Sequence, residues 1–217
     1  MKNVPFIAIE GPIGVGKTSL AKKIASHFNF ALLTEIVEEN PFLGKFYDNI
    51  EEWSFQTEMF FLCNRYKQLE DIERDYLQEE KPVVSDYHVL KNMIFAKRTL
   101  PEDKFEKYEQ IFHILTEDIA KPNMIVYLHA SLDTLLKRIE KRGRKVEKNI
   151  QPEYLEQLSA DYDVFMENFE ADHPDIPVIH INGCTYDFVE KQEDLNEILA
   201  IISEKLEQFS GERKKQT

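Results

Sequence analysis

A glycine-rich stretch near the N-terminus constrains the fold of this chain more than any other feature. It is FIAIEGPIGVGKTSLAKKIA, in which Gly11, Gly16, Lys17 and Thr18 stand in the spacing GxxxxGK[ST]. A strand-like segment at 4–9 precedes it, and a helix-like segment follows. Glycines allow the backbone to curl so that successive N–H groups point at one anion, and the helix adds the positive end of its dipole. The spacing therefore predicts a phosphate-binding P-loop.

The residues of this loop have expected roles. Lys17 is expected to reach the β- and γ-phosphates of a nucleoside triphosphate, and the Thr18 hydroxyl is expected to ligate Mg²⁺. The residues expected to bind ATP in this segment are Gly11, Pro12, Ile13, Gly14, Val15, Gly16, Lys17, Thr18 and Ser19.

Short apolar runs alternate with longer helical patterns along the chain. Buried strands are predicted at 4–9, 31–35, 82–86, 124–130 and 177–181, and helices at 17–28, 53–79, 88–99, 102–120, 131–141, 152–170 and 189–209. This alternation predicts an α/β fold of the P-loop type, a three-layer sandwich with a five-stranded parallel sheet and helices on both faces. We expect a single domain over 1–209 and a frayed tail at 210–217.

The composition limits the cellular setting and the partners. The net charge of −13 repels nucleic-acid backbones, so any phosphate must be bound by a local positive cluster. No apolar run approaches the ~18 residues of a membrane span, and the N-terminus lacks the form of a signal peptide. The two cysteines, Cys63 and Cys184, are far apart and lack metal-ligand spacing. These features predict a cytoplasmic protein that binds neither nucleic acid nor a membrane.

The local positive cluster is LKRIEKRGRKVEKN. It places Arg138 and Arg142 four residues apart, on one face of a helix, with Arg144 just beyond Gly143. Gly143 can end the helix and act as a hinge. Three guanidinium groups above a triphosphate suit phosphoryl transfer, because catalysis of that reaction is mostly positioning and electrostatics. We therefore expect an arginine-rich lid, with the solvated face of a basic helix as the alternative.

Three classes of nucleotide-binding protein compete at this point. A GTPase should carry an Asn-Lys-x-Asp signature, which is absent from the sequence. A mechanical ATPase should have an apolar strand that ends in Asp-Glu, and PVVSDYHV does not supply one. A kinase of a small molecule is therefore favoured.

Five motifs in order give the chain a family resemblance: GPIGVGKT, LLTEIVEENPFL, FYDNIEEWSFQ, SDYHVLKNMIFA and RIEKRGR. Together they resemble the deoxynucleoside kinases, the family of the deoxycytidine, deoxyadenosine, deoxyguanosine and mitochondrial-type thymidine kinases. Within it the bacterial deoxyguanosine kinases are most similar. The resemblance covers nearly the whole chain. It implies transfer of the γ-phosphoryl group of ATP or another NTP to the 5′-hydroxyl of a deoxynucleoside with Mg²⁺, in a homodimer formed through two long helices.

The resemblance also implies roles for individual residues. Glu35 would face the 5′-hydroxyl and accept its proton, with Glu38 and Glu39 as neighbouring alternatives. Tyr47 and Glu147 match positions that bind the sugar 3′-hydroxyl. The remaining matches are Phe95, which would stack on the base unless it is a plain core residue, and Asp187 and Phe188, which would hold the adenine of the donor.

One motif departs from the family pattern. The third strand usually ends in Glu-Arg-Ser or Asp-Arg-Ser, whereas here it ends in Ser85, Asp86, Tyr87 and His88. Asp86 can supply the acidic residue near Mg²⁺ and the γ-phosphate. The arginine beside it is missing, so either Tyr87 or His88 contacts the 5′ oxygen, or the lid arginines carry that charge.

Glu58 and Arg65 interrupt an otherwise apolar helical pattern seven residues apart, on one helix face. At the position of Glu58 the wider family has a glutamine that contacts the base. An ionised carboxylate only accepts hydrogen bonds, and guanine presents the adjacent donors N1–H and N2–H₂. Arg65 would then donate to guanine O6 and N7. The pattern favours deoxyguanosine, with deoxyinosine next. The alternative is an internal salt bridge between Glu58 and Arg65.

Several rival functions stay open. The acceptor could be deoxyadenosine or deoxycytidine, or the base specificity could be broader. A nucleoside monophosphate kinase would need basic residues on the acceptor side, where the segments TEIVEEN and YDNIEEW are acidic. A non-catalytic nucleotide sensor would bind nucleotide without turnover.

Overall fold

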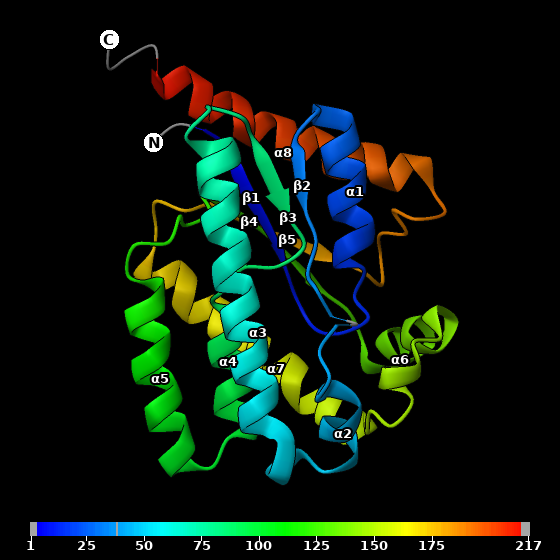
Figure 1. The fold of residues 1–217 in the computed structure, drawn as a ribbon. Coiled ribbons are helices and arrows are strands. Elements are labelled where there is room, and N and C mark those ends of the chain that lie inside the picture. Colours follow the sequence, from blue (N-terminus) through cyan, green and yellow to red (C-terminus); the bar gives the residue numbers. More distant parts are fainter. Residues whose placement is uncertain (1–3, 38, 214–217) are drawn as a thin grey trace.

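The computed structural model describes residues 4–37 and 39–213 and contains one sheet of five parallel strands. The strands are β1 Phe6–Glu10, β2 Ala31–Leu33, β3 Val83–Ser85, β4 Met124–His129 and β5 Val178–Asn182, in the order β2-β3-β1-β4-β5 (Figure 1). Every residue of β1 is buried, as expected for a central strand covered on both faces. The predicted α/β sandwich is confirmed.

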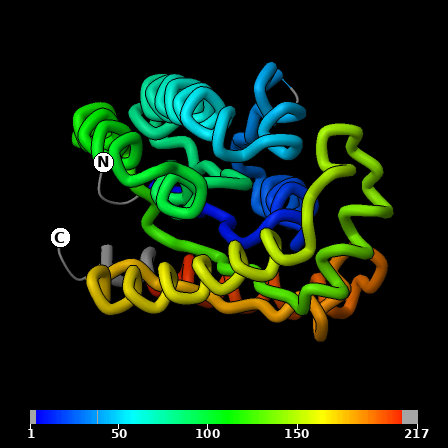
Figure 2. The backbone as a smooth tube through the Cα atoms, turned by 90° about the horizontal axis from the view of Figure 1, so that it is seen from below, coloured from blue at the N-terminus to red at the C-terminus, as the bar shows by residue number. Residues whose placement is uncertain are grey.

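Eight α-helices surround this sheet within the described part of the chain. In Figure 2, α3 and α5 lie on one side of the molecule, and α7 and α8 lie on the other. The helix α1 packs against β1, β2 and β3, while α4 contacts α3, α5 and α7. The bounds are α1 Lys17–Phe28, α2 Leu43–Asp48, α3 Ile50–Ile72, α4 Lys91–Thr99, α5 Glu102–Thr116, α6 Leu132–Arg142, α7 Pro152–Asp172 and α8 Gln192–Arg213.

The helix boundaries differ from the predictions at several places, among them the end of α5, which lies at Thr116 rather than at 120. The six-residue helix α2 is too short to give a periodic signal. The long helix α3 begins after Asn49, whose side chain accepts a hydrogen bond from the Glu52 N–H, and it passes into a π-helical turn at Glu73–Leu77. The helix α4 begins at Lys91 rather than at 88. At the C-terminus α8 continues to Arg213, so the tail predicted from 210 is helical up to that residue, and 214–217 lie outside the described residues.

The parallel arrangement fixes the location of the functional site. The carboxyl ends of parallel strands meet at one edge of a sheet, and ligands bind there. The P-loop follows β1 at this edge, Glu35 follows β2, and Asp86 follows β3. Since β2, β3 and β1 are adjacent, these three segments lie side by side.

Candidate active site

The P-loop has the backbone that its glycines predict. Gly11, Gly14 and Gly16 all have positive φ angles, of 143°, 86° and 110°. A Cβ atom on Gly14 would lie 2.7 Å from Ile139 Cγ1 and 2.9 Å from the Leu135 carbonyl oxygen, both in α6. The loop therefore depends on glycine both for its conformation and for the close approach of the lid helix.

A substitution in this loop should be costly. We expect Gly14→Ala to destabilise the protein by about 1–3 kcal/mol and to weaken ATP binding, because alanine is strained at positive φ and meets α6. Thermal unfolding and nucleotide titration check this. Gly44→Ala is the matched control, because Gly44 lies in α2 with no atom within 4 Å of an added Cβ. It should leave ATP binding unchanged and raise stability by less than about 1 kcal/mol. Equal effects of the two substitutions would contradict this account.

The side chain of Lys17 extends back over the P-loop. Its Nζ donates to the carbonyl oxygens of Gly11 at 2.7 Å and Pro12 at 3.0 Å. Burial and the charge of Lys91 lower the pKa of Lys17 to about 8, against the opposing effect of nearby carboxylates. Lys17 thus lies in a partly dehydrated position where an anion would be attracted strongly.

Thr18 and Asp86, the residues expected to ligate Mg²⁺, are in contact. The Thr18 hydroxyl donates to Asp86 Oδ2, and Asp86 Oδ1 accepts from the Glu35 N–H at 2.7 Å. Mg²⁺ in nucleotide sites usually takes one or two protein oxygens and completes its shell with phosphates and water. Among the described residues no group of three or more His, Cys, Asp or Glu side chains could hold a metal ion. The pair therefore fits an ion that is shared with a bound triphosphate.

Glu35 lies between two cations. Its carboxylate accepts from Arg65 Nε at 2.9 Å and also from Arg65 Nη2, and Lys91 Nζ lies 2.9 Å and 3.0 Å from its two oxygens. Burial alone would raise the pKa of Glu35, but the charges of Lys91 and Arg65 outweigh burial and hold that pKa well below its usual range. Of the alternatives, Glu39 is exposed, and residue 38 lies outside the described residues. Glu35 is thus a fixed, ionised carboxylate.

Lys91 is the main residue that the sequence analysis missed. Tyr87 and His88, the two residues expected to take the place of the missing arginine, are buried. Neither lines the cavity of about 710 Å³ that contains Lys17, Glu35 and Lys91. The Tyr87 hydroxyl donates instead to Gln68 Oε1 at 2.7 Å, and the His88 N–H donates to Glu10 Oε1 at 2.5 Å. The sequence signal for Lys91 was a lysine within the apolar segment VLKNMIFA. The direction of its side chain depends on α4 starting at residue 91.

Glu58 and Arg65 both point inward from α3, but they do not bond to each other. Glu58 is 2% exposed, and its Oε2 has no hydrogen-bond partner among the described residues. Burial raises the pKa of Glu58 to about 7, although Arg65 and Lys91 oppose the shift. The guanidinium of Arg65 bonds to Glu35 and, through Nη1, to Asn92 Oδ1 at 2.6 Å. The internal salt bridge between Glu58 and Arg65, which was the alternative to base contacts, is therefore absent from the described residues.

The aromatic residues predicted for the acceptor side also meet here. Tyr47 and Phe95 are half-buried and line the same cavity as Glu58, and Phe61 of α3 adds a third ring. Phe95 also packs against the core, where its ring meets Tyr162 edge-on at 6.3 Å. Burial and the neighbouring carboxylates, of which Glu147 has the largest effect, raise the pKa of Tyr47.

The lid arginines divide into two groups. Gly143 ends α6 in a left-handed conformation, as predicted, and Arg142 and Arg144 both pair with the buried Glu147. Arg142 Nη2 lies 2.7 Å and 2.6 Å from the two oxygens of that carboxylate. Arg138 was expected to act with them, yet its Nη1 and Nη2 donate to the Val15 and Gly183 carbonyl oxygens, both at 2.8 Å. Although it borders the cavity, Arg138 thus ties α6 to the P-loop.

The loop predicted to hold the donor base is ordered by its own contacts. Asp187 Oδ1 accepts from the Glu190 N–H at 3.1 Å, and the Asp187 N–H donates to Asp194 Oδ2 at 2.6 Å. Phe188 is 1% exposed and would lie 3.0 Å from a Cβ atom on Gly16. Its ring therefore packs against the P-loop and contributes to the lining of the cavity.

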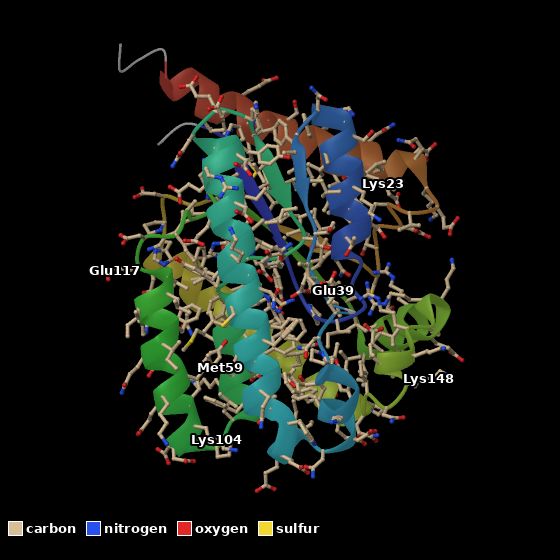
Figure 3. All side chains as sticks on the ribbon, viewed as in Figure 1. Lys23, Glu39, Met59, Lys104, Glu117 and Lys148 are labelled. Atoms are coloured by element: carbon tan, nitrogen blue, oxygen red, sulfur yellow. The ribbon has the colours of Figure 1, made fainter. Side chains whose placement is uncertain are left out.

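One cavity of about 710 Å³ joins all these parts. Lys17, Thr18 and the loop at Asp187 line one half, and Tyr47 and Glu58 line the other. Glu35, Asp86 and Lys91 also line it, and their mutual contacts connect the two halves. In Figure 3, the labelled Met59 lies on α3 and the labelled Lys148 lies beyond α6. A P-loop, a lid and a second compartment lined by carboxylates and aromatic rings define a P-loop kinase of a small acceptor.

Comparisons with known proteins agree with this class. The deoxynucleoside kinase family model matches residues 7–207, so the chain belongs to the deoxynucleoside kinase family and is an ATP-dependent phosphotransferase. The chain is 54% identical over 204 residues to the deoxyguanosine kinase of Bacillus subtilis, covering 94% of this chain and 99% of that protein. It is 28% identical to the deoxyadenosine/deoxycytidine kinase of the same organism, covering 91% of each.

A solved structure of similar fold is the deoxyadenosine kinase from M. mycoides with bound dATP. It superimposes with a TM-score of 0.78 at 24% identity, covering 92% of this chain and 99% of the other. Among the described residues, none of the helices combines the length and apolar character needed to cross a bilayer.

Proposed function

We propose that this kinase phosphorylates the 5′-hydroxyl of deoxyguanosine, using ATP and Mg²⁺, and gives dGMP. The observation that carries the proposal is the buried Glu58 carboxylate in the acceptor half of the cavity, one oxygen of which has no hydrogen-bond partner among residues 4–37 and 39–213. A buried acceptor without a donor is costly, and guanine N1–H and N2–H₂ would satisfy it in parallel. The similarity to a relative named deoxyguanosine kinase supports the same acceptor.

Arg65 has fewer N–H groups free to contact the base than the sequence analysis assumed. Three of its five N–H groups are already used on Glu35 and Asn92. Two remain to donate to the guanine O6 and N7 edge. Deoxyinosine, which keeps N1–H and O6, is expected to be the next-best acceptor.

The mechanism follows from the residues between the two halves of the cavity. The 5′ oxygen forms a bond to the γ-phosphorus while the bond from that phosphorus to the β–γ bridging oxygen breaks, and Glu35 accepts the hydroxyl proton. Lys17 neutralises the β- and γ-phosphates, and Arg142 and Arg144 are placed to do so from the lid. Thr18 and Asp86 would hold Mg²⁺, which supplies further neutralisation of the phosphate oxygens. The products are dGMP and ADP.

The acidic lining also bears on the rival acceptors. Glu35, Glu58 and Glu147 all line the cavity. They would repel the phosphate of a nucleoside monophosphate, which supports a neutral nucleoside as the acceptor.

A substrate panel tests the proposal. The four deoxynucleosides, deoxyinosine, guanosine and dGMP are each incubated with ATP and Mg²⁺, and ADP release is measured. We expect the highest kcat/KM for deoxyguanosine. Preference for deoxyadenosine or deoxycytidine would support the alternative acceptors. Turnover of dGMP but not of deoxyguanosine would support a monophosphate kinase, and nucleotide binding without turnover would support a sensor.

The proposed acceptor preference should depend on pH. With a pKa of about 7, Glu58 is ionised above pH 7 and protonated below it. A protonated carboxyl loses one acceptor position and gains a donor, which suits adenine N1 better than guanine N1–H. The ratio of kcat/KM for deoxyguanosine to that for deoxyadenosine should therefore fall as the pH is lowered from 8 to 6. A constant ratio would contradict this assignment. The groups that act on Glu58 are Arg65, Lys91 and Glu35, and the tyrosines on which Glu58 acts in turn are Tyr47, Tyr108 and Tyr154.

We also propose a homodimer formed through α3 and α5, in the cytoplasm. The two helices pack side by side, and Ile114 on α5 is 75% exposed, an unusual position for a large apolar side chain. Both cysteines are free and exposed, which suits a reducing compartment. We expect sedimentation to give the mass of a dimer and Ile114→Glu to shift it toward the monomer. A monomeric parent protein would contradict the dimer.

A further inference from the structure

We propose that Lys91 is the positioning residue that replaces the missing third-strand arginine: it holds Glu35 in line with the acceptor hydroxyl and adds positive charge beside the transferred phosphoryl group. This inference rests on the proposed function, since it assigns a part in that reaction. Lys91 lies within the motif SDYHVLKNMIFA, but the sequence analysis assigned it no role.

The first observation is the geometry of the ammonium group. Lys91 is the first residue of α4, is 5% exposed, and lies within 3.0 Å of both oxygens of Glu35. Its Nζ is also 5.4 Å from the centre of the Phe95 ring, whose face attracts a cation. A long, flexible side chain is thus held in one place by two neighbours.

The second observation is that the arginines around the cavity make their hydrogen bonds and ion pairs wholly or partly with groups other than Glu35. Arg138 bonds to backbone carbonyl oxygens, and Arg142 and Arg144 pair with Glu147. Arg65 reaches Glu35 but divides its donors between that carboxylate and Asn92. Within the described part of the chain, the hydrogen bonds of the Lys91 ammonium go to Glu35 alone, and an ammonium carries three donors.

The third observation is the proximity of a second buried ammonium. Lys17 and Lys91 both line the cavity, and Lys17 Nζ is held at the P-loop by the Gly11 and Pro12 carbonyl oxygens, so the two ammonium groups repel each other across the cavity. An anion bound between them relieves that repulsion. The γ-phosphoryl group in transit from the P-loop toward Glu35 is such an anion, and the charge it carries during transfer is spread over its equatorial oxygens. Lys91 therefore stabilises the transition state of phosphoryl transfer as well as the ionised carboxylate of Glu35.

The start of α4 explains how a lysine can do this. Tyr87, at the position of the missing arginine, is fully buried and directs its hydroxyl to Gln68, away from the cavity. An arginine at 87 would point in that direction. Lys91, four residues later, is brought to the cavity because the chain turns between His88 and Leu90 before the helix begins.

The test compares Lys91→Met, Lys91→Gln and Lys91→Arg with the parent protein on deoxyguanosine and ATP. Lys97→Met is the matched control, because Lys97 is exposed on the same helix. We expect the two neutral variants to lose about 10²- to 10³-fold in kcat, with KM for deoxyguanosine changed only a few-fold, and Lys91→Arg to stay within about tenfold of the parent. The control should be unaffected.

Rescue by arginine and the split between kcat and KM separate positioning from mere packing. A purely structural role would raise KM along with the loss of kcat, whereas positioning predicts a near-parental KM in the neutral variants and recovery of kcat in Lys91→Arg. The charged groups that face Glu35 are Arg65 and Glu58 from α3, Lys91 from α4, Lys17 from the P-loop, Glu10 from β1 and Asp86 after β3.

The outcomes are distinct. A neutral variant with kcat within threefold of the parent would overturn the assignment to Lys91 and leave the proposed function intact. So would a folded Lys91→Arg variant as inactive as Lys91→Met. If Lys91→Met does not fold, Lys91→Gln gives the same comparison. A parent protein that turns over no deoxynucleoside would instead overturn the proposed function.

Discussion

Replacing Glu35 with glutamine is expected to lower kcat on deoxyguanosine by about 10²- to 10⁴-fold. Glutamine keeps the size of the side chain but cannot accept the 5′-hydroxyl proton at neutral pH. It also leaves two buried cations, Arg65 and Lys91, without their anion. Steady-state kinetics with deoxyguanosine and ATP measure the effect, and ATP binding, measured by titration, should persist.

Stability must be followed in the same experiment. Removing one partner of a buried ion pair costs about 3–5 kcal/mol when nothing replaces it, so the Tm of Glu35→Gln should fall. Glu39→Gln is the matched control, because Glu39 is exposed in the same loop and does not line the cavity. Assays are made well below the Tm of each variant. A folded Glu35→Gln protein with parental kcat would show that another group accepts the proton.

The parts of the site whose location the sequence predicted are those determined locally. The P-loop is a contiguous motif whose glycines define its own backbone, and Gly143 ends its helix wherever that helix lies. Glu35 and Asp86 were predictable for a related reason. They follow strands, and parallel strands deliver their carboxyl ends to one edge.

The parts that it missed depend on contacts between distant segments. Arg138 and Arg142 share a helix face, so their spacing predicts one common role, yet the carbonyl oxygens of Val15 and Gly183 bind the first and Glu147 binds the second. The sequence analysis did not single out Lys91 within its motif. The direction of the Lys91 side chain follows from the start of α4, which lies three residues later than predicted. The roles of such side chains depend on which polar groups of other helices, strands and loops bind them. The periodicity of the sequence does not contain this information.

The charge distribution connects these findings. The chain has a net charge of −13, but Lys17, Arg65 and Lys91 are collected around one cavity. Each has at least one carboxylate or carbonyl oxygen within hydrogen-bond distance, which offsets part of the desolvation of these cations. In this arrangement a bound triphosphate meets a local positive field, while the acidic surface repels larger polyanions.

Replacing Glu58 with glutamine is expected to shift the preference away from deoxyguanosine. Two charge-assisted hydrogen bonds of about 1.5–3 kcal/mol each would be lost or weakened, which corresponds to about 10²- to 10⁴-fold in kcat/KM. The amide N–H₂ would also face guanine N1–H as a second donor, whereas it can donate to adenine N1. The ratio of kcat/KM for deoxyguanosine to that for deoxyadenosine measures the change, and its dependence on pH should disappear, because glutamine does not titrate.

Two further measurements make this experiment decisive. Glu51→Gln is the matched control, because Glu51 is exposed in the first turn of the same helix, and it should leave the ratio unchanged. Glu58→Gln should also unfold at a higher temperature than the parent at pH 8. The raised pKa of Glu58 means that burying the ionised form costs stability, and this cost grows as the pH rises from about 4.5 through 7. A variant that gains stability but keeps its deoxyguanosine preference would show that Glu58 is a strained core residue and that the base is recognised elsewhere.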